Sequence, residues 1–284
     1  MRCSLPPRYC AVRLPWARAA HPSAARRPFN PMLDPEDRIY GGQLAVPGSR
    51  PWQAGIYTHR YSHFCGGALI NDRYVLTAAH CVWSKLSTSV RVHLGSYARR
   101  AVDNTEVVYK VEEVCAHPRY KPSGSALKNT DIAILKLQKS VEFAPTISPV
   151  CLPKHNEELP AESLLYVTGW GSTDAGRVIQ KSHELKQALT KELPRANCSS
   201  AIPEVMCGSH EYGSSCFGDS GGPVVHQRNG TWTLFGLVSG GPWVCGDADE
   251  YPSSSPRFPT LWTLYSALHG PEHAKERIRK SATH

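Results

Sequence analysis

Short apolar runs separated by turn-forming residues recur along the chain between residues 53 and 238. This spacing of short runs between turn signals is typical of an all-β fold. Both faces of several runs are apolar, as expected for strands packed inside small closed barrels. The pattern predicts an all-β fold with strands at 53–57, 68–70, 74–77, 90–94, 107–114, 132–137, 164–168, 223–226 and 231–238.

The two ends of the chain lack this pattern. Residues 1–38 are rich in Pro, Ala and Arg without sustained periodicity, which predicts an irregular segment. After Thr260 the pattern becomes helical and predicts a short C-terminal helix, which Gly270-Pro271 interrupts. We therefore expect one folded domain over 39–270, followed by a charged tail at 271–284.

The net charge of +8 is concentrated at these ends. Residues 1–38 carry seven Lys/Arg against three Asp/Glu, and residues 271–284 carry four against two, so only +2 remains between them. Nucleic-acid binding needs basic residues on one folded face, so we expect no nucleic-acid partner. No stretch has the length and hydrophobicity of a membrane span, so we expect no membrane association either.

Ten cysteines without zinc-site spacing predict disulfides and an oxidising compartment. We therefore expect a secreted protein. Residues 1–30 contain six arginines and no apolar core of the length that a signal peptide needs. Two explanations stay open: a start upstream of Met1, or unconventional export. The glycosylation triplets at Asn197 and Asn229 are compatible with secretion.

Three short motifs place a histidine, an aspartate and a serine in the order of a nucleophilic triad. His80 lies in a segment of small residues, Asp131 precedes an apolar run, and Ser220 lies in the Gly-Asp-Ser-Gly-Gly sequence of 218–222. A serine hydroxyl needs a base such as His80, and a carboxylate such as Asp131 orients the imidazole. The backbone amides of Gly218 and Ser220 are spaced to stabilise an oxyanion.

These motifs resemble the trypsin/chymotrypsin family of serine endopeptidases. Further landmarks follow in family order at 38–42, 51–53, 65–67, 167–171 and 238–241. The resemblance implies two six-stranded antiparallel β-barrels, at about 39–149 and 150–260, with the active site between them. It also implies protein or peptide substrates, protein inhibitors, a monomer and no cofactor. Calcium binding stays open, because Glu106 alone survives of the family's metal-loop carboxylates and Ser96 replaces another.

The resemblance also implies three disulfides: Cys65 with Cys81, Cys198 with Cys207, and Cys216 with Cys245. A fourth family bridge is lost at both ends together, where Leu165 and His226 stand. The remaining cysteines are Cys3, Cys10, Cys115 and Cys151. By resemblance Cys151 pairs with Cys10 or Cys3, whereas Cys115 is either a buried free thiol or part of a second bridge to the N-terminal segment.

Arg38-Ile39 resembles the activation bond of the family, so residues 1–38 are expected to be a pro-segment that an activating protease removes. The new α-amino group of Ile39 would pair with Asp219. A buried carboxylate without a partner is costly, so the surroundings of Asp219 should be poorly ordered before cleavage.

Two pocket positions make the substrate preference unusual. Ser214 stands where trypsin-like enzymes have an aspartate, which argues against cleavage after Lys or Arg. Arg257 falls at the back of the same pocket and resembles the arginine of granzymes that cut after aspartate. An acidic substrate side chain would supply its missing partner. Cleavage after apolar residues stays an equal alternative.

Further substrate contacts are expected from Ser215 and from the backbone of Ser239 to Gly241, which would pair with an extended substrate. Gly240 replaces the tryptophan that the family has after this serine. A second functional class also stays open, a catalytically silent homologue that binds partners through the same fold.

Overall fold

The computed structural model describes residues 42–99, 103–122, 130–154, 157–160, 162–172, 181–198, 205–209, 215–240 and 253–256. The pro-segment, Arg38, Ile39, the C-terminal helix and the charged tail predicted above lie outside these residues. No helix within them is long and apolar enough to span a membrane.

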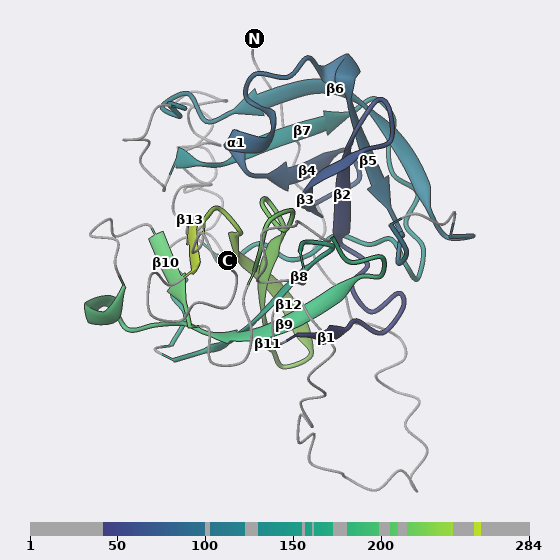
Figure 1. The fold of residues 1–284 in the computed structure, drawn as a ribbon. Coiled ribbons are helices and arrows are strands. Elements are labelled where there is room, and N and C mark those ends of the chain that lie inside the picture. The colour runs from purple at the N-terminus through teal and green to yellow at the C-terminus, as the bar shows by residue number, and fades with distance from the viewer. Residues whose placement is uncertain are drawn as a thin grey trace, which may run out of the picture.

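Six antiparallel strands of the first half form a closed barrel in the order β2-β3-β4-β7-β6-β5. The upper part of Figure 1 shows this barrel. Its strands are β2 (Gln53–Thr58), β3 (His63–Leu69), β4 (Tyr74–Thr77), β5 (Val90–Leu94), β6 (Val107–Ala116) and β7 (Ala133–Leu137). Between β4 and β5 lie a one-turn helix, α1 (Ala79–Val82), and a 3-10 turn, η2 (Ser87–Ser89).

The second half forms a five-stranded sheet in the order β1-β9-β8-β11-β12 and a separate β10-β13 pair. These strands are β1 (Gln43–Leu44), β8 (Leu164–Gly169), β9 (Lys186–Lys191), β10 (Val205–Gly208), β11 (Pro223–Arg228), β12 (Thr231–Leu237) and β13 (Ser253–Pro256). A short 3-10 turn, η4 (Arg195–Asn197), precedes β10. The all-β, chymotrypsin-like fold class is confirmed, with one closed six-stranded barrel; in the described residues the second half forms the five-stranded sheet and the strand pair instead of a second closed barrel.

Strand β4 shows why both faces of the predicted runs are apolar. Val75 faces the interior of the closed barrel, whereas Tyr74 and Leu76 belong to a second apolar cluster with Trp232 and Leu234 of β12. Side chains alternate between the two faces of a strand, so each face of β4 covers a different core. The second cluster therefore joins the first barrel to the second half.

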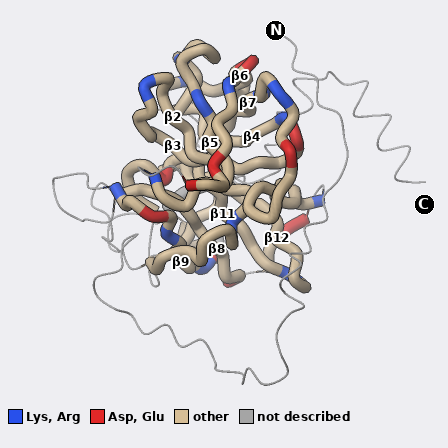
Figure 2. The backbone as a smooth tube through the Cα atoms, turned by 90° about the vertical axis from the view of Figure 1, so that its right-hand side faces the viewer, with Lys and Arg blue, Asp and Glu red and all other residues tan. Residues whose placement is uncertain are grey.

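The charged side chains do not divide the molecule into acidic and basic faces. In Figure 2 the blue and red segments are interspersed over both halves of the described chain. This distribution gives no support to a phosphate-binding face, which would need clustered Lys and Arg.

Candidate active site

Strand pairing in the first barrel brings His80 next to Asp131. β4 and β7 are antiparallel neighbours, with Thr77 opposite Ala133. His80 follows the end of β4 in α1, and Asp131 comes just before the start of β7. The two residues are 51 positions apart in sequence, yet register alone places them at the same end of the barrel.

Asp131 contacts His80 through both carboxylate oxygens. The His80 amide donates to Oδ1 at 2.8 Å, and Nδ1 of the imidazole lies 2.7 Å from Oδ2. Because the carboxylate accepts at Nδ1, that nitrogen carries the proton and Nε2 is left to accept one. The carboxylate side chain is only 8% exposed and the imidazole 35%, so the base faces solvent while its partner is buried.

Ser239 is a further partner of Asp131. Its hydroxyl donates to Oδ2 at 2.5 Å, across 108 positions of sequence. Ser239 was expected in the substrate-binding strand. Its contact with Asp131 could not be predicted, because no local motif signals a hydrogen bond between the end of β12 and the start of β7. The second half of the chain thus helps to hold the carboxylate.

Ser220 lies in the turn before β11 and is held against the first barrel. Its carbonyl accepts from the Gly66 amide at 2.8 Å, and the Thr77 hydroxyl donates to the Gly66 carbonyl at 2.8 Å. Gly221 follows with φ +77°, and a Cβ there would collide with Thr77 Oγ1. Only glycine fits this close approach without strain.

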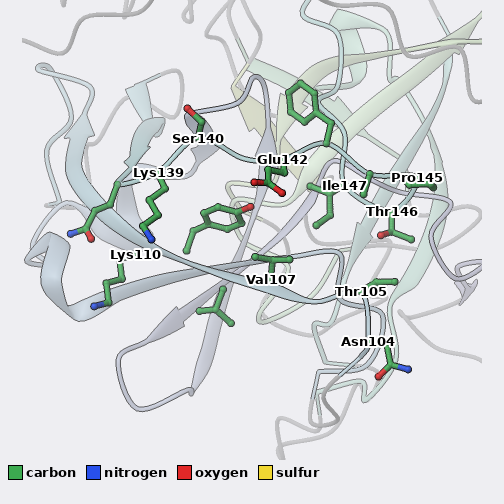
Figure 3. Close-up of a pocket in the computed structure, with 15 residues that line it drawn as sticks. Asn104, Thr105, Val107, Lys110, Lys139, Ser140, Glu142, Pro145, Thr146 and Ile147 are labelled. Atoms are coloured by element: carbon green, nitrogen blue, oxygen red, sulfur yellow. The ribbon is translucent and has the colours of Figure 1, made fainter.

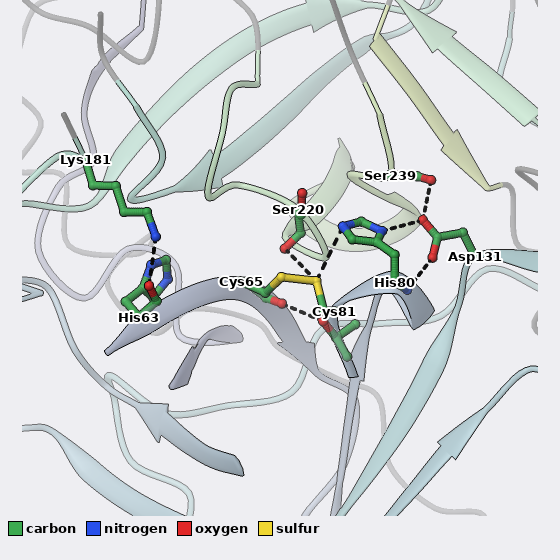
Figure 4. Close-up of a disulfide and its surroundings, with 10 residues drawn as sticks. His63, Cys65, His80, Cys81, Asp131, Lys181, Ser220 and Ser239 are labelled. Atoms are coloured by element: carbon green, nitrogen blue, oxygen red, sulfur yellow. Dashed lines mark hydrogen bonds and ion pairs between the residues drawn. A yellow bond between two sulfur atoms is a disulfide. The ribbon is translucent and has the colours of Figure 1, made fainter. Parts of the chain in front are cut away.

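Cys81 Sγ lies between His80 and Ser220. It is 3.6 Å from His80 Nε2 and 3.8 Å from the Ser220 carbonyl oxygen, and Figure 4 shows the side chains gathered around it. Within the described residues, the Ser220 hydroxyl makes no hydrogen bond with His80. The structure thus brings the three predicted residues together, but the serine is not yet joined to the base.

Comparisons with known proteins identify the family of this chain. The Trypsin family matches residues 39–260. This chain belongs to the trypsin family. It is also 35% identical over 227 residues to an ovochymase of Halocynthia roretzi. That alignment covers 76% of this chain but only 14% of the ovochymase, so it supports the family and not the activity of the whole relative.

As in the expectation for a trypsin-family chain, Cys65 is bonded to Cys81 and Cys198 to Cys207. The first bond ties α1 to β3 directly beside His80. It also means that Cys65, His80 and Cys81, whose ligand atoms lie within 4.8 Å of one another, offer no thiolate pair to a metal.

Three other described cysteines, Cys115, Cys151 and Cys216, are disulfide-bonded too. The free-thiol alternative for Cys115 is therefore wrong. Cys115 is buried beside Ile134, where a thiol would also have packed well, so burial alone could not distinguish the two states. The predicted partners Cys3, Cys10 and Cys245 lie outside the described residues.

Asp219, next to the predicted nucleophile, is completely buried. Its carboxylate accepts from the Gly171 amide at 2.7 Å and from the Cys216 amide at 2.9 Å. Burial raises the pKa of Asp219 to about 6, although these two hydrogen bonds and the charge of Lys181 act against the rise. In the part of the chain that the structure describes, no cation forms an ion pair with this carboxylate.

The remaining pocket residues are only partly described. Ser215 is 7% exposed, and Gly218 has φ +101°, in the left-handed region that favours glycine. Ser214, Gly241 and Arg257 lie outside the described residues, so the acidic-substrate prediction and its apolar alternative stay predictions.

In the loop that the resemblance compares with the family's calcium site, Glu106 contacts two protein groups. The Ser96 hydroxyl donates to one oxygen of Glu106 at 2.6 Å, and His93 Nδ1 lies 3.1 Å from the other. Asp103 accepts the amides of Tyr97 and Ala98. Ser96 and Glu106 could be recognised from the sequence, but His93 could not, because it reaches Glu106 through the pairing of β5 with β6.

A hollow of about 950 Å³ lies elsewhere, on the first barrel, between the start of β6 and the segment 138–147. Figure 3 shows the side chains that line it, among them Val107, Lys110, Lys139 and Glu142. None of the predicted catalytic residues lines this hollow.

Proposed function

We propose that this trypsin-family chain is a secreted serine endopeptidase, made as a zymogen and activated by cleavage of the Arg38–Ile39 bond. The observation that carries the proposal is the hydrogen-bonded set of His80, Asp131 and Ser239, with Ser220 held against the same sulfur atom as the imidazole. A base, its orienting carboxylate and a hydroxyl nucleophile are the groups that acyl transfer requires.

In the proposed reaction, the Ser220 hydroxyl attacks the carbonyl carbon of the cut bond and His80 Nε2 takes its proton. Asp131 stabilises the imidazolium, and the amides of Gly218 and Ser220 donate to the oxyanion. The intermediate collapses as His80 returns the proton to the departing amine, which leaves an acyl group on Ser220. Water then attacks this ester by the same route and frees the enzyme.

Activation would act through Asp219. Before cleavage this carboxylate is buried with two amide donors, and no cation among the described residues pairs with it. The α-amino group of Ile39, freed by an activating protease that cuts after Arg38, would supply that cation. Gly169 and Gly171 support the proposal, since a Cβ on either would collide with the Asp219 carboxylate.

Two substrate classes fit the pocket sequence. Arg257 favours cleavage after acidic residues, because an incoming carboxylate would pair with the guanidinium. If Arg257 turns outward, Ser214 leaves a neutral pocket and cleavage after apolar residues follows. Profiling on a peptide library decides between them: Arg257→Gly should abolish an acidic preference, and a wild type without that preference contradicts the role of Arg257.

The competing proposal is a silent homologue that binds protein partners, and the missing hydrogen bond between Ser220 and His80 keeps it open. A serine-reactive fluorophosphonate separates the two. Labelling of the chain cut at Arg38, but not of its Ser220→Ala variant, supports the enzyme. A correctly cut and folded chain that does not label favours the binding protein.

A further inference from the structure

Asp219 needs compensation for its buried charge even before cleavage. Its carboxylate is fully buried, and among the described residues only the Gly171 and Cys216 amides donate to it. Moving a carboxylate out of water costs several kcal/mol unless a charge compensates it. Asp219 is nevertheless buried in the uncut chain, so we expect a nearby cation to stabilise its charge.

The aliphatic side chain of Lys181 packs against Gly218, the residue before Asp219. Its Cε and Cδ are 3.1 and 3.5 Å from the position that a Cβ on Gly218 would occupy. Its Nζ donates to the His63 carbonyl at 2.7 Å, as Figure 4 shows. The side chain therefore spans from β3 of the first barrel to the loop of the predicted oxyanion donor.

The backbone around Lys181 is fixed to both halves of the molecule. The Arg99 guanidinium donates to the carbonyls of Lys181, at 3.3 Å, and Ser182, at 2.9 Å. The Ser182 amide donates to the Gly171 carbonyl at 3.0 Å, and Gly171 in turn donates to Asp219. Lys181 thus contacts Gly218, and Ser182 contacts Gly171, so this segment lies against two glycines next to the buried Asp219 carboxylate.

The ammonium of Lys181 also acts on Asp219 through space. Its charge lowers the pKa of Asp219, and it is the one cation of the described residues that has this effect. Burial lowers the pKa of Lys181 itself, and Asp219 opposes that change. Charges interact more strongly where water is excluded, so a half-buried ammonium can stabilise a carboxylate without direct contact.

We propose that Lys181 is a positioning residue that holds the loop of Gly218 and Asp219 near its active shape before Arg38 is cut, giving the uncut chain a basal reactivity at Ser220. The inference rests on the proposed function. After cleavage the α-amino group of Ile39 pairs with Asp219 directly, so the contribution of Lys181 becomes small.

The test measures fluorophosphonate labelling rates in an uncleavable Arg38→Gln chain and in the cut wild-type chain. Lys181→Met keeps an unbranched side chain that reaches the position of Cε and removes the charge, whereas Lys181→Arg keeps the charge. Lys191→Met is the matched control, since Lys191 pairs with Glu162 at the surface.

The uncut parent should label measurably faster than its Ser220→Ala variant. Lys181→Met should slow the uncut chain by about tenfold or more, as expected for the loss of one buried charge interaction. Lys181→Arg should stay within about threefold of the parent. Lys191→Met should not change the rate, and Lys181→Met in the cut chain should lose less than about threefold, since Ile39 then supplies the charge.

Three results overturn the inference: an uncut parent no faster than Ser220→Ala, an uncut Lys181→Met chain as fast as its parent, or equal losses in the cut and uncut chains. The last would mean that Lys181 only supports the fold.

A cut wild type that fails to label contradicts the proposed function instead. In that case amide exchange of residues 216–220 in the uncut chain still tests Lys181. Faster exchange in Lys181→Met than in the parent supports the positioning role, and unchanged exchange overturns it.

Discussion

The histidine side and the serine side of the candidate site are built in different ways. On the histidine side, adjacent strands of a closed barrel bring His80 to Asp131, and three hydrogen bonds fix the carboxylate. On the serine side, Ser220 follows a fully buried Asp219 that accepts two amides and pairs with no cation in the described part of the chain. The first side is complete in the uncut chain, and the second is not.

This difference locates a control point. Strand pairing fixes the positions of His80 and Asp131 as soon as the barrel folds, so a later event has little effect on their geometry. The nucleophile loop depends on a charge that the barrel does not supply. In the proposed activation, a new α-amino group at Ile39 would supply this charge, so cleavage at Arg38 would act on Ser220 without touching His80.

Breaking the histidine side should have the largest effect. Asp131→Asn lets the imidazole adopt the wrong tautomer, so kcat of the cut chain should fall about 10,000-fold while the fold is kept. Steady-state cleavage of a peptide substrate measures this. Asp103→Asn is the matched control, because Asp103 also accepts two backbone amides but lies outside the site. A cut Asp131→Asn chain that keeps a tenth of the activity would contradict the assigned role.

On the serine side, the buried Asp219 should make the unfolding free energy depend on pH. The pKa of Asp219 is raised from 3.8 to about 6, so between these values the folded chain holds a proton that the unfolded chain has released. The unfolding free energy of the uncut chain should therefore fall by about 2 to 3 kcal/mol as pH rises from 4 to 7, through this group alone.

Urea unfolding of the uncut Arg38→Gln chain and of its Asp219→Asn variant isolates the carboxyl. The comparison is needed because buried His63 acts in the opposite direction. Burial lowers the pKa of His63 to about 3, so its contribution to stability is lost as pH falls from 6.5. If the difference in unfolding free energy between the two chains does not change with pH, the pKa of Asp219 is not raised in the folded chain.

The smallest effect is expected where the two sides meet. Ser239 comes from the second half and donates to Asp131 of the first. Ser239→Ala removes one hydrogen bond to a charged group, so kcat/KM should fall about tenfold. Ser89→Ala is a control, since its hydroxyl donates to an exposed backbone carbonyl. A loss as large as that of Asp131→Asn would mean that Ser239 fixes the whole site.

The sequence predicted the first barrel better than the second half. Strands at 74–77 and 90–94 agree with β4 and β5 to the residue, because apolar side chains mark both faces of β4 and Val90, Val92 and Leu94 mark one face of β5. Strand β9 was missed because Lys186 and Thr190 occupy its buried positions and hide the alternation. Strands β1, β10 and β13 were also not predicted. Each has at most four residues, too few to form a recognisable pattern.

The triad was found from its motifs, whereas its surroundings were not. His80, Asp131 and Ser220 each stand in a recognisable run of residues, and the structure brings them together. The contacts of Ser239, Lys181 and His93 join segments far apart in the chain. No local pattern encodes such contacts, so only the fold reveals them.

The central claim is that cleavage at Arg38 joins the serine side to the histidine side. A crystal structure of the cut chain tests it most directly. We predict an ion pair between the Ile39 α-amino group and Asp219, and a hydrogen bond of about 2.6 to 3.2 Å between Ser220 Oγ and His80 Nε2. A docked Ile39 with Ser220 still out of reach of His80 would contradict the account.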